Sequence, residues 1–142
     1  MRQRPLFPLA VDRIGNGNLM ATILIVDDEV FIRLVAELMV QELGHETMTA
    51  GDAAGALKYL ESSMKIDALF TDIRFKTNKY GGFELAQLGI KLRPELRVLY
   101  TTGGSMTDEL RALFVDGAHF VQKPYTENQL QNSMEKLFAA TQ

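Results

Sequence analysis

Four polar sites are spread along the chain, and each follows a short run of apolar residues. The pair Asp27 and Asp28 follows ILIV, Asp72 follows ALFT, Thr102 follows VLYT, and Lys123 with Pro124 follows HFVQ. In an open parallel α/β sheet, the carboxyl ends of the strands converge on one crevice, where such folds place their ligands. Carboxylates, a hydroxyl and a lysine gathered at one point favour a site for a divalent metal and a phosphoryl group.

The residue types at these sites suit transfer of a phosphoryl group to a carboxylate. Such transfer depends on positioning and charge neutralisation more than on elaborate covalent chemistry. Mg²⁺ prefers oxygen ligands and is commonly held by one or two protein carboxylates, and these sites offer three, on Asp27, Asp28 and Asp72. Lys123 offers a flexible point charge for a phosphoryl oxygen. Gly103 would leave room for that group beside Thr102.

Each of these residues also has an ordinary structural interpretation when it is considered alone. Asp27, Asp28 and Glu29 could be acidic residues at the start of a helix. Thr102 is a β-branched residue typical of strands, and Lys123 alone would be a solvated surface charge. The ordered set, rather than any single residue, therefore carries the hypothesis.

Composition limits the classes of protein that need to be considered. The chain has 142 residues, of which 46% are hydrophobic, enough for one domain with a buried core. The net charge of -3 and the scattered Lys and Arg residues argue against direct nucleic-acid binding. The absence of cysteine excludes disulfides and thiolate chemistry, and His45 and His119 have no second metal ligand at a useful spacing. No segment approaches the roughly 18 apolar residues of a membrane span, and a cytoplasmic protein is expected.

Residues 1–20 differ in character from the rest of the chain. Pro5, Pro8 and Asp12 interrupt the short apolar stretch, and the GNGN segment at 15–18 favours a loop. A secretory signal would need a longer apolar run and a cleavage site of small residues. The expected organisation is a flexible N-terminal extension over 1–20, followed by one domain over 21–142.

From residue 22 onward, apolar runs of strand length alternate with segments of helical spacing. Strands are predicted at 22–26, 46–50, 67–71, 96–101 and 118–122. Helices are predicted at 30–43, from Asp52 to about residue 62, at 83–92, at 107–115 and after Thr126. Strands and helices that alternate in this way predict a doubly wound α/β fold, with a parallel sheet covered on both sides.

Five sequence segments, in this order, resemble the receiver domain of two-component response regulators. They are ILIVDDE, LFTDI, GGFELA, VLYTTGG and FVQKPYT, and the resemblance covers about residues 21–140. It implies a flavodoxin-like (βα)5 fold with a five-stranded parallel sheet in the order 2-1-3-4-5. It also implies a stand-alone, single-domain receiver similar to the chemotaxis receivers.

The resemblance assigns a role to each polar site. Asp72 would be the phosphoacceptor. Mg²⁺ would be bound by Asp28, Asp72 and the backbone carbonyl of Arg74, with Asp27 acting through bound water. Lys123 would be the cation that contacts the phosphoryl group.

Two further residues would form the switch implied by the resemblance. Thr102 would donate a hydrogen bond to the phosphoryl group, and Phe120 would rotate toward the core into the space that Thr102 vacates. This movement would alter the surface formed by the fourth helix, the fifth strand and the fifth helix. Because Phe120 has no hydroxyl to satisfy, a bias toward its inward orientation is expected. A cis peptide bond between Lys123 and Pro124 is also expected from the family.

The leading interpretation is a protein that accepts a phosphoryl group on Asp72 from a sensor histidine kinase or a histidine phosphotransfer protein. Its output would be binding to a downstream protein partner or onward transfer in a phosphorelay, and a homodimer could form through the switch surface. No substrate turnover is expected beyond self-phosphorylation and auto-dephosphorylation. One alternative is an inactive pseudo-receiver that serves only as an interaction module. Another is a Mg²⁺-dependent phosphatase with an aspartyl-phosphate intermediate, but the Asp-x-Asp pattern of that class is lacking at 72–74.

The loop after Asp72 departs from the usual pattern of the family. Phe75 and Lys76 stand where receivers usually carry methionine and proline, and Gly82 comes later than the usual glycine. The loop is therefore longer and lacks the stiffness of proline, which leaves partner recognition and the lifetime of the acyl phosphate open. The side chain of Arg74 is expected near the mouth of the site, where it could stabilise the phosphoryl group or shield it from water.

Overall fold

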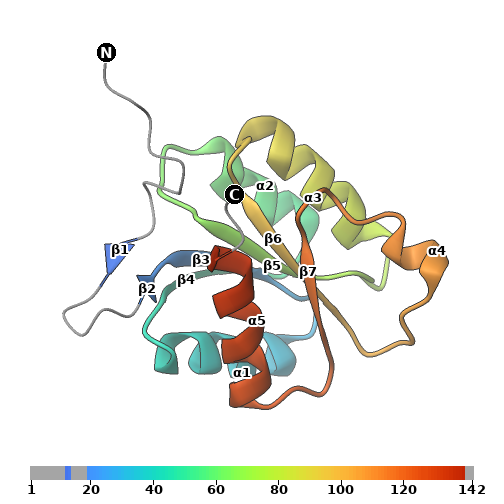
Figure 1. Cartoon of the computed structure of the whole chain (residues 1–142). Coiled ribbons are helices and arrows are strands. Elements are labelled where there is room, and N and C mark those ends of the chain that lie inside the picture. Colours follow the sequence, from blue (N-terminus) through green and yellow to red (C-terminus); the bar gives the residue numbers. More distant parts are fainter. Residues whose placement is uncertain (1–11, 14–18, 140–142) are drawn as a thin grey trace.

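The computed structural model describes residues 12–13 and 19–139, and its centre is a five-stranded parallel sheet (Figure 1). The sheet and its helices follow one another as β3 (Thr22–Val26), α1 (Val30–Glu42), β4 (Glu46–Ala50), α2 (Ala53–Glu61), β5 (Ala68–Asp72), α3 (Gly81–Leu92), β6 (Arg97–Thr102), α4 (Asp108–Arg111), β7 (His119–Gln122) and α5 (Glu127–Ala139). The strand order is β4-β3-β5-β6-β7. Numbered along the chain, this is the order 2-1-3-4-5, so the predicted flavodoxin-like fold is confirmed.

A separate pair of two-residue strands precedes this sheet. β1 (Asp12–Arg13) pairs antiparallel with β2 (Leu19–Met20). The flexible extension predicted over residues 1–20 otherwise lies outside the described residues, and it stays a prediction.

The sheet is covered on both faces, by α1 and α5 on one side and by α2 and α3 on the other (Figure 1). β3 and β5 are buried along their whole length, as expected of central strands in a parallel sheet. Successive residues of a strand point to opposite faces. Leu24 and Val26 therefore join the core on the α2 and α3 side, whereas Ile23 and Ile25 join the core on the α1 and α5 side.

Two predicted helix boundaries are confirmed. α1 ends at Glu42, and Gly44 follows with φ of 97°, in the left-handed region that glycine adopts at lowest cost. Asp52 caps α2, because its carboxylate accepts a hydrogen bond of 2.7 Å from the N–H of Gly55.

The apolar residues of α1 do not all reach the core. Ala36 and Val40 are buried, but Phe31, Leu34 and Leu38 are exposed, Phe31 to 73%. α1 thus presents an apolar face to solvent beside the carboxyl end of the sheet.

The length predicted for the helix over 107–115 is wrong, since α4 covers only Asp108–Arg111 and contains no buried residue. Beyond α4 the chain leaves the helix and places the ring of Phe114 against that of Tyr100, with centroids 4.7 Å apart. The N–H of Val115 donates to the Tyr100 hydroxyl at 3.3 Å. Packing on Tyr100 therefore overrides the helical pattern of the sequence.

The start predicted for α3 at residue 83 is also wrong, because the helix begins at Gly81. A Cβ on Gly82 would overlap the carbonyl oxygen of Asp72 and lie 2.8 Å from Cα of Ile73. The N–H of Gly82 donates to the Ile73 carbonyl at 2.9 Å. The first turn of α3 is packed directly on the end of β5, which only glycine permits.

We predict that Gly82→Ala destabilises the protein by about 1–3 kcal/mol, because the added methyl group would overlap backbone atoms that cannot rotate away. Gly103→Ala is the control, since a Cβ there meets no atom within 4 Å. Urea unfolding curves give both values. A Gly82→Ala protein as stable as the native one would contradict the close packing of α3 on β5.

Candidate functional site

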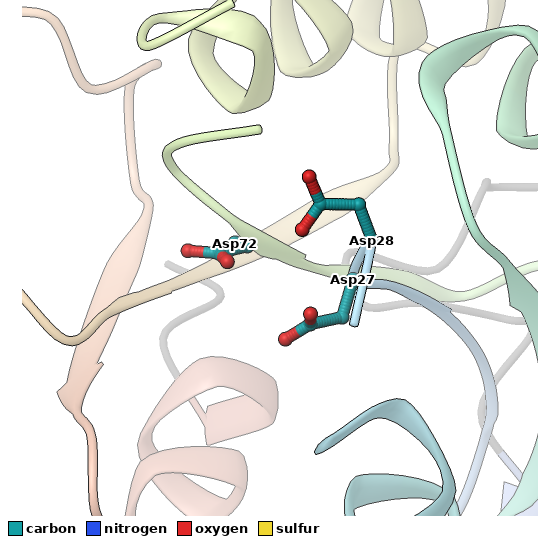
Figure 2. Close-up of side chains that lie close together, drawn as sticks. All are labelled: Asp27, Asp28 and Asp72. Carbon is teal, nitrogen blue, oxygen red and sulfur yellow. The ribbon is translucent and has the colours of Figure 1, made fainter. Parts of the chain in front are cut away.

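Three aspartate carboxylates meet at the carboxyl end of the sheet (Figure 2). Asp27 and Asp28 directly follow β3, and Asp72 is the last residue of β5. One oxygen from each carboxylate lies within 4.8 Å of the others. Because β3 and β5 are hydrogen-bonded neighbours, the pairing of two buried strands holds the three carboxylates together, as the sequence predicts.

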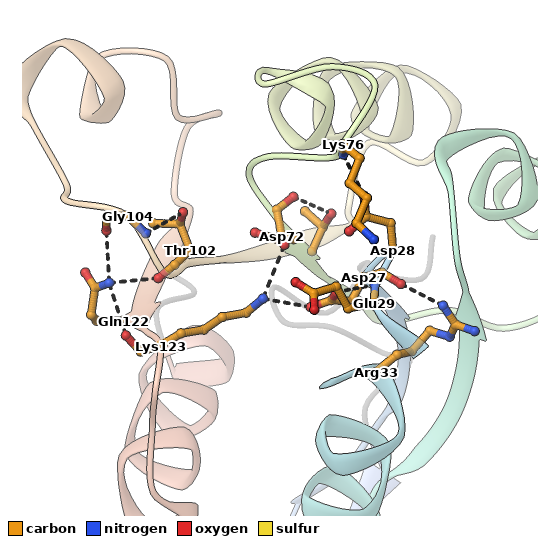
Figure 3. A network of polar contacts seen from close by, with 11 residues as sticks. Asp27, Asp28, Glu29, Arg33, Asp72, Lys76, Thr102, Gly104, Gln122 and Lys123 are labelled. Atoms are coloured by element: carbon orange, nitrogen blue, oxygen red, sulfur yellow. Dashed lines mark hydrogen bonds and ion pairs between the residues drawn. The ribbon is translucent and has the colours of Figure 1, made fainter. Parts of the chain in front are cut away.

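Lys123 extends into this cluster from the end of β7 (Figure 3). Its Nζ lies 2.8 Å from Asp27 Oδ2 and 3.2 Å from Asp72 Oδ2. Burial by itself lowers the pKa of Lys123, but the hydrogen bond to Asp27 and the charges of Asp72 and Asp27 outweigh it and raise this pKa. The ammonium group therefore stays charged beside the carboxylates. The peptide bond between Lys123 and Pro124 is cis, as expected from the family.

Asp72 lies in surroundings that disfavour its charged form. Burial raises its pKa, and the charge of Asp27 raises it further. The charge and hydrogen bond of Lys123 and a hydrogen bond from the backbone of Arg74 act in the opposite direction, but the pKa of Asp72 remains raised. Burial is thus the main reason that the charged form of Asp72 is disfavoured.

Asp27 and Asp28 differ in their hydrogen bonds. Asp27 Oδ1 accepts the N–H of Glu29 at 2.9 Å, and its Oδ2 is occupied by Lys123. Asp28 Oδ2 accepts the N–H of Lys76 at 2.6 Å. Both carboxylate oxygens of Asp27 therefore accept hydrogen bonds from protein groups. That Asp27 contacts Mg²⁺ through a bound water stays a prediction.

Thr102 is buried at the end of β6 and leads into the loop that follows, here called the Thr102 loop. Its hydroxyl accepts a hydrogen bond of 3.2 Å from the N–H of Gly104. Its carbonyl accepts the N–H of Lys123 at 3.0 Å and the Nε2 group of Gln122 at 2.8 Å. Gln122 Nε2 also donates to the Gly104 carbonyl at 3.0 Å (Figure 3). The end of β6, with the predicted switch hydroxyl, and the Thr102 loop are thus tied to the end of β7.

Phe120 is half-buried on β7 and packs against the core on the α2 and α3 side. Its ring centroid lies 6.3 Å from that of Phe114. Phe120 therefore contacts the core in this structure, and its role as a switch stays a prediction.

Arg74 is exposed, and its side chain extends across the mouth of the site to the loop after β6. A Cβ on Gly104 would lie 2.8 Å from Arg74 Nη2. The loops after β5 and β6 therefore approach each other through this guanidinium group, beside the predicted phosphoacceptor. The role of the Arg74 carbonyl as a metal ligand stays a prediction.

Three groups at the site escaped the sequence analysis. The first is Tyr125, whose pKa is raised to about 12 by burial and then by the charges of Asp27 and Asp72. Its position directly after Lys123 and Pro124 is the sequence feature that could have indicated a place at the site. The amide of Gln122 had no signal beyond being polar before Lys123. The third is the N–H of Lys76, and its only sign in the sequence is that lysine replaces the proline usual at this position, which has no N–H.

The carboxylate cluster fits Mg²⁺ in its chemistry. Its donors are oxygens, the atoms that Mg²⁺ prefers, and its three carboxylates face one ammonium group, that of Lys123. A divalent cation would offset the repulsion between the three carboxylates. Among the described residues, no other group of three such side chains meets this spacing.

A family model of the response regulator receiver domain matches residues 23–135. The chain belongs to the response regulator receiver family. The nitrogen assimilation regulatory protein NtrX of Azorhizobium caulinodans is 30% identical over 109 residues, which are 76% of this chain and 24% of that protein. This receiver thus spans about a quarter of the length of the NtrX relative.

Solved receiver structures agree with this assignment. A response regulator receiver protein from Sinorhizobium medicae is 28% identical with a TM-score of 0.77, and the match covers 87% of this chain and 98% of that one. TrrA of Thermotoga maritima, solved in complex with Mg²⁺ and BeF, is 29% identical with a TM-score of 0.69, covering 83% and 99%. Receiver domains accept phosphoryl groups, generally bind Mg²⁺, and interact with histidine kinases and downstream effectors. In the part of this receiver that the structure describes, no helix is long and apolar enough to cross a membrane.

We predict that Asp72→Asn raises the thermal midpoint of the metal-free receiver at neutral pH. The folded-state pKa of Asp72 is raised, so the folded receiver binds this proton more tightly than the unfolded chain does. Ionisation of Asp72 therefore lowers the stability of the fold as the pH rises, first through the pKa of Asp72 in the unfolded chain and then through its higher pKa in the folded receiver. The advantage of Asp72→Asn should shrink in acid, where the native side chain is protonated in both states.

Melting curves in EDTA over a range of pH measure this difference, with Asp116→Asn in an exposed loop as the control. An Asp72→Asn receiver no more stable than the native one at neutral pH would contradict the unfavourable charge of Asp72.

Proposed function

We propose that Asp72 accepts a phosphoryl group from a phosphohistidine in a Mg²⁺-dependent reaction, and that the Thr102 loop responds to it. The observation that carries this proposal is the cluster of three carboxylates within 4.8 Å, with Lys123 in contact with two of them. Such a cluster has a carboxylate in place to react, and its three carboxylates outnumber the one ammonium group that contacts them. The expected compartment is the cytoplasm.

The chemistry follows from the groups around Asp72. A carboxylate oxygen would attack phosphorus, so that an O–P bond forms as the P–N bond of phosphohistidine breaks and the imidazole leaves with the electron pair. Lys123, 3.2 Å from Asp72 Oδ2, would pair with the phosphoryl oxygens. Asp28, Asp72 and the Arg74 carbonyl would hold Mg²⁺, which supplies positive charge when bound and so offsets the charge on the transferred group.

The response would begin at Thr102. Its hydroxyl accepts from Gly104 N–H, and the hydroxyl hydrogen remains available to donate to a phosphoryl oxygen. Movement of Thr102 toward Asp72 would strain the hydrogen bonds from Gln122, which join this loop to β7. Phe120 lies on β7, so the surface of α4, β7 and α5 would change, to be recognised by a downstream partner or a second copy of the chain.

A groove beside α1, which shares Phe31 with the exposed apolar face of that helix, is the surface on which we propose that the phosphoryl donor docks. A groove of about 430 Å³ runs from Phe31, Val35 and Met39 on α1 to Gly103 and Lys123 at the site. A donor that covers this groove would bury exposed apolar surface and bring its histidine to the crevice. The groove therefore favours a protein donor with an apolar face, such as a helix of a sensor kinase or a histidine phosphotransfer protein.

We predict that acetyl phosphate with Mg²⁺ adds one phosphoryl group to the native receiver, and that Asp72→Ala abolishes this labelling. The exposed Asp116→Ala variant should be labelled like the native receiver. Intact-protein mass spectrometry distinguishes the products. An inactive pseudo-receiver would give no label on any of the three proteins, and equal labelling of the Asp72→Ala variant would place the phosphoacceptor elsewhere.

We also predict that Phe31→Ser slows phosphotransfer from a cognate phosphorylated kinase by about tenfold, as expected for an exposed aromatic anchor, and leaves labelling by acetyl phosphate unchanged. Leu92→Ser on α3, 45% exposed in the native receiver, is the matched control. Transfer of radiolabelled phosphate gives both rates. Loss of equal size in the two variants would exclude α1 as the docking surface.

A further inference from the structure

The loop between β5 and α3 contacts the carboxylate cluster through one backbone group. The N–H of Lys76 donates to Asp28 Oδ2 at 2.6 Å (Figure 3). A hydrogen bond from an amide to a charged carboxylate is shorter and about twice as strong as one between neutral groups. This bond joins the loop to a side chain at the site that lies far away in sequence.

The loop is built in a way that fixes the direction of this N–H. Phe75 and Asn78 form an antiparallel bridge, with Phe75 N–H to Asn78 carbonyl at 2.9 Å and Asn78 N–H to Phe75 carbonyl at 3.0 Å. Lys76 and Thr77 are therefore the two central residues of a β-turn. Asn78 Nδ2 also donates to Glu84 Oε1 at 2.8 Å, which ties the turn to α3.

The side chain of Phe75 anchors the turn to the body of the domain. It is only 8% exposed and belongs to the core on the α2 and α3 side. A Cβ on Gly81 would overlap its ring, so the glycine leaves the space that Phe75 fills. The turn is held by these contacts independently of Asp28, and the Lys76 N–H is presented to the carboxylate.

The geometry points to the Lys76 N–H as a positioning group for Mg²⁺: it holds Asp28 toward Asp72, so that the turn at residues 75–78 and the metal ion stabilise each other. This inference rests on the proposed function, because it concerns the same metal site.

A carboxylate has about four lone-pair sites on its two oxygens. The Lys76 N–H takes one of them on Oδ2, and no hydrogen bond from the described residues occupies Oδ1 of Asp28. The hydrogen bond and a metal ion can therefore be accommodated on one carboxylate. Groups that orient the ligands of a metal in this way commonly affect its affinity.

Proline at position 76 provides a sharp test, because it removes the N–H together with an exposed side chain whose loss can be controlled for. Position 76 is the first central residue of the turn, where proline is favoured, and Phe75 before it lies in an extended bridge, as a residue before proline should. Lys76→Ala is the matched control, since it removes the same side chain but keeps the N–H.

We expect Lys76→Pro to bind Mg²⁺ about tenfold more weakly than Lys76→Ala, as measured by isothermal titration of the ion alone into each protein. Asp28→Asn should lose most of the affinity. Hydrogen exchange provides a second readout on the native chain: the Lys76 amide should exchange slowly, exchange faster in Asp28→Asn, and keep or gain protection when Mg²⁺ is added.

Equal affinity of Lys76→Pro and Lys76→Ala would overturn the inference while leaving acetyl phosphate labelling of Asp72, and so the proposed function, intact. Tighter binding by Lys76→Pro, or loss of Lys76 protection on adding Mg²⁺, would overturn it as well, because the N–H would then compete with the ion. Native-like affinity of Asp28→Asn would remove Asp28 from the metal site and overturn it too. Failure of labelling itself would instead reject the proposed function.

Discussion

Repulsion between the carboxylates of Asp27, Asp28 and Asp72, which the sheet holds close together, is the main constraint on the site. Oxygens of the three carboxylates lie within 4.8 Å of one another, and two unit charges at that distance repel by about 3.5 kcal/mol at an effective dielectric constant of about 20. That is a substantial part of the roughly 5–15 kcal/mol by which a domain of this kind is stable. Lys123 contacts two of the three carboxylates and offsets one unit of their charge, while burial raises the pKa of Asp72 and the charge of Asp27 raises it further. Burial of β3 and β5 on both faces holds the carboxylates in place despite this cost.

Much of the fold could be predicted because it depends on local patterns. Apolar runs and helical spacing identified every strand of the sheet and the side chains at their carboxyl ends, and Asp52 and Gly44 marked helix boundaries by their chemistry. The errors occurred where contacts distant in sequence decide the structure. α4 is short because Phe114 packs on Tyr100, and α3 starts early because Gly82 lies against β5. Neither contact leaves a periodic signal.

The loop after Asp72 shows the same limit at the site. The sequence carries Lys76 where receivers usually carry proline, which predicts a less rigid loop. The structure shows a bridged turn anchored by Phe75 instead. A missing proline removes one constraint but also supplies an N–H, and only the fold reveals that this N–H meets Asp28. Backbone donors of this kind carry no signal in side-chain patterns.

The alternation of side chains along each strand separates the two surfaces that a receiver needs. On β7, Phe120 packs on the α2 and α3 side, and Val121 packs on the α1 and α5 side. The groove that we assign to the donor lies on the α1 side, so a bound donor need not cover Phe120. The two sides meet around the end of the sheet, where Gln122 joins the Thr102 loop to Lys123 through backbone carbonyls. A partner that binds the Phe120 surface would therefore respond to the charge on Asp72 whether or not a donor occupies the groove beside α1.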